Sequence, residues 1–503
     1  MTQHYQPINH TFLSDLKSVY FIGAGGIGMS ALIRYFLAKG KHVAGYDRTP
    51  SPLTDHLAKE GVAIHFTEDV SLIPDDFRDK DSTWVVYTPA VPSSHEELVY
   101  FQANDFIVLK RSQVLGLLSN SPYSLCIAGT HGKTTTTSMT AHLFKQSSVD
   151  CNAFLGGILK NYNSNLLISN KSDVVVVEAD EYDRSFHALR PYMAVITAAD
   201  PDHLDIYGSP QAYRESFEHF TSLIQTGGSL IMKKGIDITP ALPPNVALFT
   251  YSTTDESADF HATNIRVGNG KIVFDLVAPS GIYATAGMPL LHSTAGIVRL
   301  RSLTVPLLHS NIIREIELGV PVRTNIENGV AAMALALLLG VKPKEIRAAM
   351  KSFAGVQRRF DFQVKTDRMV YIDDYAHHPE ELQSSIRSIR ELYEGRKVTG
   401  IFQPHLYSRT KDFASEMAEA LSLLDRLILL DIYPAREEPI PGVTSAIIFD
   451  QVTMPDKTLC KKEELMEILD KEDIDVLVTF GAGDIDRFVE PIRIMLNKKQ
   501  ERL

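Results

Sequence analysis

The chain has 503 residues, 44% of them hydrophobic and 22% charged, which is typical of globular protein and excludes extended disorder. Its 50 lysines and arginines against 61 aspartates and glutamates give a net charge of −11, so we expect neither a nucleic-acid nor a membrane partner, since both need a basic face. The 3 cysteines form no CxxC pair, which excludes a disulfide scaffold and a zinc ribbon.

The two features that would direct the chain to a membrane are missing from the sequence. The N-terminal segment lacks a basic region followed by an apolar one, so we expect no secretory signal. The longest apolar helical stretch, residues 330–339, is shorter than the roughly 20 residues that cross a bilayer. We therefore expect a soluble, cytoplasmic protein.

A glycine motif opens the first part of the chain. Gly23-x-Gly25-x-x-Gly28 lies between an expected strand and an expected helix, and Asp47 ends the next expected strand. This arrangement is the dinucleotide fingerprint, in which glycines let the backbone approach a diphosphate and the acid binds a ribose hydroxyl. The glycines do not distinguish NAD from a UDP-sugar, and a tight turn without a ligand is the remaining alternative.

A second strand–loop–helix unit begins at Ser124 and contains a candidate phosphate loop at residues 129–134, GTHGKT. Its glycines and the helix N-terminus suit phosphate oxygens, Lys133 supplies a positive charge, and the Thr134 hydroxyl can bind Mg²⁺. The longer standard pattern GxxxxGK[ST] needs glycine at position 127, which is Ile127. An ordinary turn into a helix is the alternative interpretation.

Two buried-type strands, at residues 173–180 and 191–200, end in acidic residues at the edge of the sheet where ligands bind. Glu178 and His203 follow these strands and could hold Mg²⁺ with Thr134. Histidine is an unusual magnesium ligand, so a loop histidine bonded to a carboxylate is an equal alternative for His203. Asp180, Glu181 and other acids lie on the same edge as possible caps or supporting groups.

The last part of the chain repeats the strand-then-polar-loop pattern. Asp374, His377 and His378 follow one expected strand, and His405 and Arg409 follow the next. Adjacent loop histidines seldom share one target, so we expect at most one to be functional. Arg409 suits a carboxylate or phosphate, with a solvated surface ion pair as the alternative.

The alternation of strands and helices predicts an α/β protein with parallel sheets. We expect three domains, at residues 1–112, 113–354 and 355–503: a Rossmann-like first domain, a central domain with a P-loop-type nucleotide site and a Rossmann-like C-terminal domain. Residues 281–318 show no clear period and are interpreted as an additional hairpin on the central domain.

The chain resembles the Mur ligase family of ATP-dependent amino-acid ligases over nearly its whole length. The most specific motifs are GAGGIGMS (23–30), AGTHGKTTTT (128–137), VVEADEYDRSF (176–186), DPDHLDIYG (200–208), DDYAHHPEE (373–381) and FQPHLYSRTKDF (402–413). The resemblance implies peptidoglycan precursor synthesis, with ATP and Mg²⁺ as cofactors and UDP-N-acetylmuramate and L-alanine as substrates, in a monomer or homodimer. Recycling of a murein tripeptide is the nearest alternative. A nicotinamide-dependent oxidoreductase is the alternative from another class.

The resemblance also implies roles for individual residues. The family pattern departs at Thr324 and Leu406, where relatives often carry histidine and arginine. The implied catalytic residues are Lys133, Glu178, His203 and His377; the metal site is Thr134, Glu178 and His203; ATP contacts are Gly129, Thr130, His131, Gly132, Lys133, Thr134, Thr135, Asn325, Asn328, Arg359 and Asp374; and contacts to the UDP-sugar and amino acid are Gly25, Gly26, Ile27, Asp47, His378, His405 and Arg409.

Overall fold

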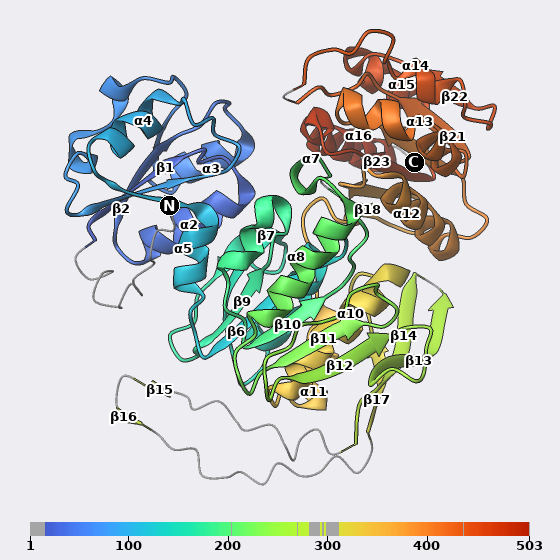
Figure 1. Ribbon diagram of the computed structural model, residues 1–503. Helices are drawn as coiled ribbons and strands as arrows, with labels where there is room; N and C mark the ends of the chain where they lie inside the picture. The colour runs from blue at the N-terminus through green and yellow to red at the C-terminus, as the bar shows by residue number, and fades with distance from the viewer. Residues whose placement is uncertain are drawn as a thin grey trace. The chain divides into compact units, whose positions relative to one another are not determined.

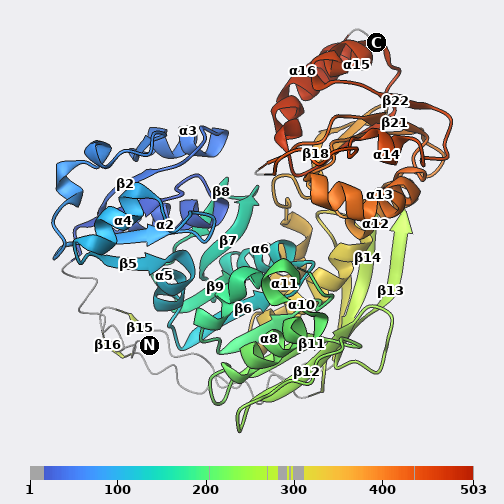
Figure 2. The same ribbon diagram turned by 45° about the horizontal axis from the view of Figure 1, so that its top comes forward.

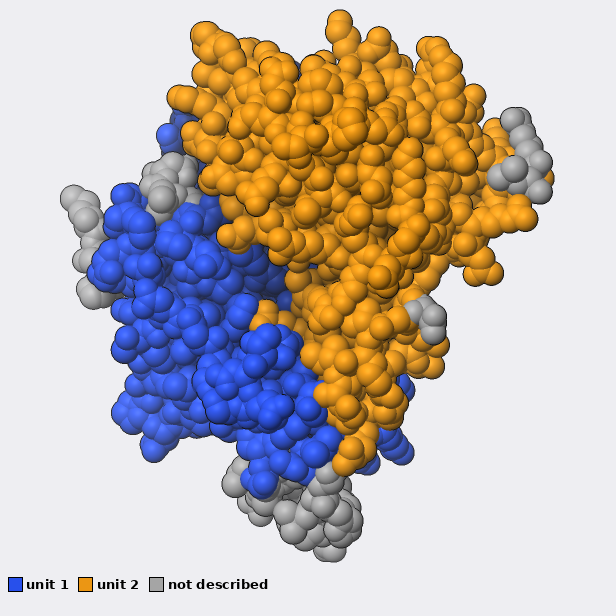
Figure 3. All heavy atoms as spheres, turned by 90° about the vertical axis from the view of Figure 1, so that its right-hand side faces the viewer, with its two compact units in different colours: residues 1–263, 276–313, 328–350 blue, residues 264–275, 314–327, 351–503 orange. Residues whose placement is uncertain are grey.

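A computed structural model describes residues 16–202, 204–268, 270–280, 292–293, 296–297, 311–435 and 437–501. Two expectations fall outside the described residues. They are the metal-site role of His203 and the lack of a secretory signal in the first 15 residues. The chain divides into two compact units, coloured blue and orange in Figure 3. Unit 1 comprises residues 1–263, 276–313 and 328–350, and unit 2 comprises residues 264–275, 314–327 and 351–503.

Unit 1 begins with a parallel sheet of order β3-β2-β1-β4-β5 (Figure 1). Every residue of β1 is buried because helices cover both faces. Phe21 packs with residues of α2 and α5 on one face, and Tyr20 packs with residues of α4 on the other. The elements are β1 (Ser18–Ile22), α2 (Ile27–Ala38), β2 (His42–Tyr46), α3 (Pro52–Lys59), β3 (Ala63–His65), η1 (Val70–Leu72), η2 (Asp75–Phe77), β4 (Thr83–Tyr87), α4 (Glu96–Ala103), β5 (Ile107–Lys110) and α5 (Arg111–Leu118).

The next sheet of unit 1 has the order β12-β11-β10-β6-β9-β7-β8 and is parallel except for β8. Its central strands β6, β9 and β10 are buried on both faces, which is why they read as nearly continuous apolar runs. Helix α2 packs on β7 and β8, so the first glycine motif lies beside this sheet (Figure 2). The elements are β6 (Tyr123–Ala128), α6 (Lys133–Lys145), β7 (Asn152–Leu159), β8 (Ser164–Leu167), β9 (Val174–Glu178), η3 (Tyr182–Ala188), β10 (Met193–Ile196), α7 (Leu204–Tyr207), α8 (Pro210–Ser222), β11 (Ser229–Lys233) and β12 (Ala247–Ser252).

The strands that follow carry the chain between the units and into unit 2. Strands β13 (Phe260–Gly268), β14 (Lys271–Val277) and β17 (Ile312–Glu317) are ordered β17-β14-β13. Helices α10 (Arg323–Leu338) and α11 (Pro343–Ser352) come next. Within 281–318, where the sequence predicts a hairpin, β15 (His292–Ser293) pairs antiparallel with β16 (Gly296–Ile297), and most of the remainder lies outside the described residues.

Unit 2 contains a sheet of order β18-β19-β23-β20-β21-β22, parallel except for β18. The polar loops expected to be functional follow β19 and β20, at the carboxyl edge of this sheet. Among the described residues, every helix falls short of the length and apolarity that crossing a bilayer needs. The elements are β18 (Asp361–Lys365), β19 (Val370–Asp374), α12 (Pro379–Leu392), β20 (Val398–Phe402), α13 (Tyr407–Leu421), β21 (Arg426–Leu429), α14 (Ala446–Phe449), β22 (Lys457–Leu459), η4 (Lys462–Glu464), α15 (Leu465–Lys471), β23 (Val476–Phe480), η5 (Asp484–Phe488) and α16 (Val489–Glu501).

Candidate active site

The first glycine motif forms the turn between β1 and α2. The Gly25 N–H donates to Asp47 Oδ2 over 2.6 Å, so Asp47 holds the turn from the end of β2. Gly26 caps α2 without a side-chain hydrogen bond, and the first turn of the helix contains no acidic residue. The N–H groups of Ile27 and Gly28 have no acceptor among the described residues. The start of α2 is therefore suited to an anion.

The candidate phosphate loop joins β6 to α6, as its sequence predicts. Gly132 has φ of +79°, a left-handed conformation in which a side chain is strained. A Cβ at this position would also lie 2.7 Å from Asn328 Oδ1. Asn328 accepts from the Thr136 hydroxyl over 3.2 Å, so α10 supports the base of the loop.

Lys133 is held inside the loop by a carboxylate and by backbone carbonyls. Its Nζ lies 2.8 Å from Glu181 Oε1 and 2.6 Å from the Gly129 carbonyl oxygen. Burial by itself lowers the pKa of Lys133, but the charge and hydrogen bond of Glu181, with the charges of Asp180 and Glu178, together outweigh it and raise that pKa above the ordinary value. Burial raises the pKa of Glu181 to about 7, although Lys133 acts to lower it. The loop thus holds a charged lysine in place before phosphate arrives.

Thr134 and Glu178 meet at the carboxyl edge of the sheet. The Thr134 hydroxyl donates to Glu178 Oε1 over 2.9 Å, and Glu178 Oε2 accepts from the Gly156 N–H over 3.0 Å. A Cβ at Gly156 would lie 2.3 Å from this carboxylate, so only glycine lets β7 approach it. The described residues contain no group of at least three His, Cys, Asp or Glu arranged for a metal. A hydroxyl and one carboxylate nevertheless fit Mg²⁺, which takes few protein ligands beside phosphate oxygens.

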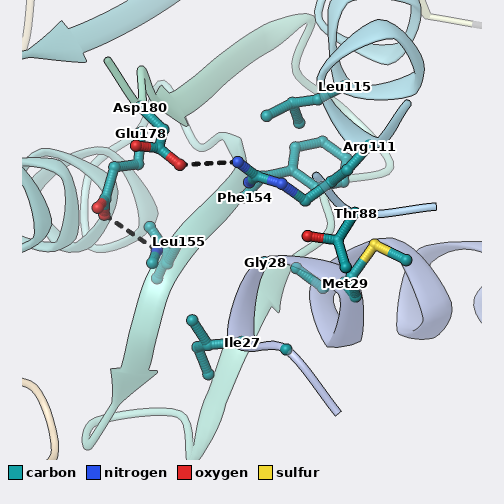
Figure 4. A pocket seen from close by; sticks show the side chains of 13 residues that line it. Ile27, Gly28, Met29, Thr88, Arg111, Leu115, Phe154, Leu155, Glu178 and Asp180 are labelled. Atoms are coloured by element: carbon teal, nitrogen blue, oxygen red, sulfur yellow. Dashed lines mark hydrogen bonds and ion pairs between the residues drawn. The ribbon is translucent and has the colours of Figure 1, made fainter. Parts of the chain in front are cut away.

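A cavity of about 280 Å³ in unit 1 lies between the first glycine motif and the carboxyl end of β9 (Figure 4). Gly26, Ile27 and Gly28 of α2 lie on one side, and Glu178 and Asp180 lie on the other. Its remaining lining is Met29, Ala31, Thr88, Arg111, Leu115, Phe154, Leu155 and Gly156.

The loops of unit 2 bring His377, His405 and Arg409 together. The ring centroids of His377 and His405 are 5.8 Å apart, and Arg409 Nη1 lies 3.4 Å from His405 Nδ1. His377 Nδ1 lies 3.0 Å from the Tyr375 carbonyl oxygen, to which it can donate. Burial lowers the pKa of His377 to about 4, so the ring is neutral near pH 7 and its Nε2 can accept a proton.

Other predicted residues of unit 2 have structural partners. Asp374 Oδ2 accepts from the Ser385 hydroxyl over 2.6 Å, and burial raises the Asp374 pKa to about 6. His378 caps α12. The Arg359 guanidinium lies 4.9 Å from the Tyr375 ring. The Asn325 amide donates to the Val320 carbonyl over 3.2 Å.

Comparisons with known proteins cover nearly the whole chain. Residues 18–123 match the model described as Mur ligase family, catalytic domain; residues 127–336 match the Mur ligase middle domain; and residues 358–483 match the Mur ligase, glutamate ligase domain. A curated relative from Parabacteroides distasonis, named UDP-N-acetylmuramate--L-alanine ligase, is 61% identical over 97% of this chain and 99% of its own length. The chain belongs to the Mur ligase family. A relative of the same name from Porphyromonas gingivalis is 53% identical over 95% of this chain and 98% of its own.

Solved structures share the fold of this Mur ligase. A UDP-N-acetylmuramate-alanine ligase from Thermotoga maritima has a TM-score of 0.74 at 24% identity, covering 97% of this chain and 100% of that one. A murein peptide ligase from Psychrobacter arcticus has a TM-score of 0.63 at 19% identity, covering 95% and 98%. These comparisons confirm the expected α/β fold.

The candidate site also contains four residues to which the sequence alone assigned no role: Glu181, Glu381, Gly156 and Arg111. Glu181 was placed on the acidic edge, but its contact with Lys133 depends on where two distant loops meet. Glu381 Oε2 accepts from the His377 N–H over 3.2 Å, a contact that forms because Glu381 lies in the first turn of α12. Gly156 stands inside a strand, where an isolated glycine indicates a close approach. Arg111 directly follows a strand, which is the one signal that could have identified it.

Proposed function

We propose that this chain joins L-alanine to the carboxylate of UDP-N-acetylmuramate, with conversion of ATP to ADP and phosphate, in peptidoglycan precursor synthesis. The observation that carries the proposal is the cavity that runs from the start of α2 to Glu178, the carboxylate bonded to Thr134 of the phosphate loop. It is large enough for part of a sugar nucleotide. The names of the relatives that are 53% and 61% identical support the same reaction.

The reaction proceeds through an acyl phosphate, because a carboxylate is a poor electrophile. An oxygen of the substrate carboxylate attacks the γ-phosphorus of ATP, and ADP leaves. The amine of L-alanine then attacks the acyl carbon, and phosphate leaves as the amide forms. Lys133 neutralises charge on the transferring phosphoryl group, and His377 takes the amine proton on Nε2.

Thr134 and Glu178 would hold Mg²⁺, which supplies positive charge next to the phosphates. His203 completes this set in the proposal. ATP is further held by residues 129–135, Asn325, Asn328, Arg359 and Asp374. Gly25, Gly26, Ile27 and Asp47 bind the UDP portion, and His378, His405 and Arg409 contact the acid and amino acid. We propose a cytoplasmic monomer or homodimer with domains at 1–112, 113–354 and 355–503.

The test is ADP release with UDP-N-acetylmuramate and each candidate acceptor. L-alanine should support turnover, and no turnover should occur without the sugar acid. A murein tripeptide that outcompetes L-alanine would assign the recycling reaction instead. Hydride transfer from NADH without ADP release would support the oxidoreductase alternative.

A further inference from the structure

Arg111, the first residue of α5, lines the cavity between the first glycine motif and the carboxyl end of β9. Its Nη2 donates to Asp180 Oδ2 over 2.8 Å, and its side chain is 17% exposed (Figure 4). Asp180 is the one hydrogen-bond partner of this guanidinium among the described residues. A guanidinium has five N–H donors, so most of them remain available in a cavity that the proposed reaction fills with an anion.

The other side of the same guanidinium lies against the start of α2. A Cβ at Gly28 would lie 2.6 Å from Arg111 Nη1 and 3.3 Å from Cδ and Cζ. The side chain therefore occupies the space that a larger residue at position 28 would fill. This places positive charge next to the N–H groups of Ile27 and Gly28, which have no acceptor among the described residues.

The acidic residues that follow β9 explain why an anion in this cavity needs a cation beside it. Asp180, Glu181 and Asp183 follow β9, and each is paired with a base: Arg111 over 2.8 Å, Lys133 over 2.8 Å and Lys110 over 3.2 Å respectively. Lys133 is the phosphate-loop lysine, so one member of this series already has an expected anionic ligand. A diphosphate at α2 would otherwise face the uncompensated charge of Asp180 and Glu178 across the cavity.

We propose that Arg111 is a substrate-positioning residue that binds the diphosphate of the sugar nucleotide. Nη2 stays on Asp180, which fixes the guanidinium, while Nη1 and the N–H groups of α2 donate to diphosphate oxygens. The inference rests on the proposed function, because it takes a UDP-sugar as the occupant of the cavity. Arginine suits this role because its planar fork can donate two parallel bonds to a phosphate.

The experiment measures binding of UDP and of UDP-N-acetylmuramate to the full-length protein by calorimetry, and then steady-state kinetics. Arg111→Gln should weaken both ligands by the same factor, roughly 10- to 100-fold, since each loses a charge-assisted bond to the shared diphosphate. The KM for the sugar nucleotide should rise, whereas the KM values for ATP and L-alanine should stay within about twofold. Lys145→Gln is the matched control, because Lys145 forms a 2.8 Å ion pair with Asp150 in the same unit but does not line the cavity.

A second variant keeps the test decisive if Arg111→Gln is poorly folded. Asp180→Asn retains an oxygen acceptor for Nη2 but removes a negative charge near the diphosphate, so UDP should bind several-fold more tightly. Weaker or unchanged UDP binding in Asp180→Asn would overturn the proposal. Two results with Arg111→Gln would also overturn it. If only UDP-N-acetylmuramate binds more weakly, Arg111 contacts the carboxylate of the substrate. If the affinity for both ligands is unchanged, Arg111 forms only a structural ion pair. If the unmodified protein binds neither ligand, the proposed function itself fails.

Discussion

Replacing Lys133 with methionine should affect stability and catalysis separately. The Lys133 and Glu181 side chains are 15% and 3% exposed and form a 2.8 Å ion pair. Lys133→Met leaves Glu181 buried without its cation, so the variant loses stability at any pH where Glu181 is ionised in the unmodified protein. The same variant loses the charge that faces the phosphates, which should lower turnover by about 10²-fold or more.

The stability loss should depend on pH in a definite direction. Burial raises the pKa of Glu181 from 4.5 to about 7, so the folded protein binds this proton more tightly than the unfolded chain. The stability contributed by Glu181 therefore falls as pH rises from about 4.5 to about 7 and then becomes constant. Without Lys133, the pKa of Glu181 in the folded protein rises further. The stability that Glu181 contributes then keeps falling up to pH 8, which adds a loss of about 1.4 kcal/mol per pH unit in the variant. At pH 6 Glu181 is protonated in both the unmodified protein and the Lys133→Met variant, so it contributes no difference in stability between them.

The assay is urea unfolding, followed by circular dichroism at pH 6 and pH 8, together with ADP release. The double variant Lys133→Met/Glu181→Gln removes the buried charge, so it should recover most of the stability while remaining inactive. An equal stability loss at both pH values, or a double variant as unstable as the single one, would refute the electrostatic reasoning. Recovery of turnover in the double variant would refute the catalytic role of Lys133.

Three further predictions concern the metal edge and unit 2. Glu178→Gln and Thr134→Val should each raise the Mg²⁺ concentration needed for half-maximal ADP release by roughly tenfold or more; an unchanged requirement would contradict the metal assignment. Gly156→Ala should lower turnover with little change in melting temperature, since its Cβ would lie 2.3 Å from the Glu178 carboxylate; normal turnover would show that this carboxylate can move freely. The pKa of His377 in the folded protein is about 4 against 6.5 ordinarily, so its contribution to stability falls as pH drops from about 6.5 to about 4. His377→Asn should therefore lose less stability than the unmodified protein over this pH range, and equal acid sensitivity would contradict the burial argument. The same variant should lower kcat/KM for L-alanine about 10²-fold.

The sequence predicted the parts of the site that local chain geometry determines. The GTHGKT loop was placed between a strand and a helix, and β6 (Tyr123–Ala128) and α6 (Lys133–Lys145) flank it. The acidic end of β9 was expected at a sheet edge, and the structure places Glu178 there beside Thr134. These predictions succeeded because strand-end polar residues converge at one edge of any parallel sheet.

The contacts between distant segments could not be read in this way. Arg111 and Asp180 are 69 positions apart, and Lys133 and Glu181 are 48 apart. The Arg111–Asp180 pairing depends on α5 packing against η3, after β9, and the Lys133–Glu181 pairing depends on β6 lying beside β9. No residue pattern along the chain encodes which segments pack together, because each segment is compatible with several neighbours until the hydrophobic core has formed.

The sequence by itself determined the family, the alternation of strands and helices, and the chemical types of residue at each strand end. These follow from side-chain periodicity and short motifs, which act within a few residues. The tertiary structure alone decided which charges neutralise each other at the acidic edge and how far burial raises the Glu181 pKa and lowers that of His377. It alone also decided that one cavity is lined by both the first glycine motif and the end of β9. Electrostatic energy depends on distance in space and on exclusion of water, and neither quantity exists until the chain has folded.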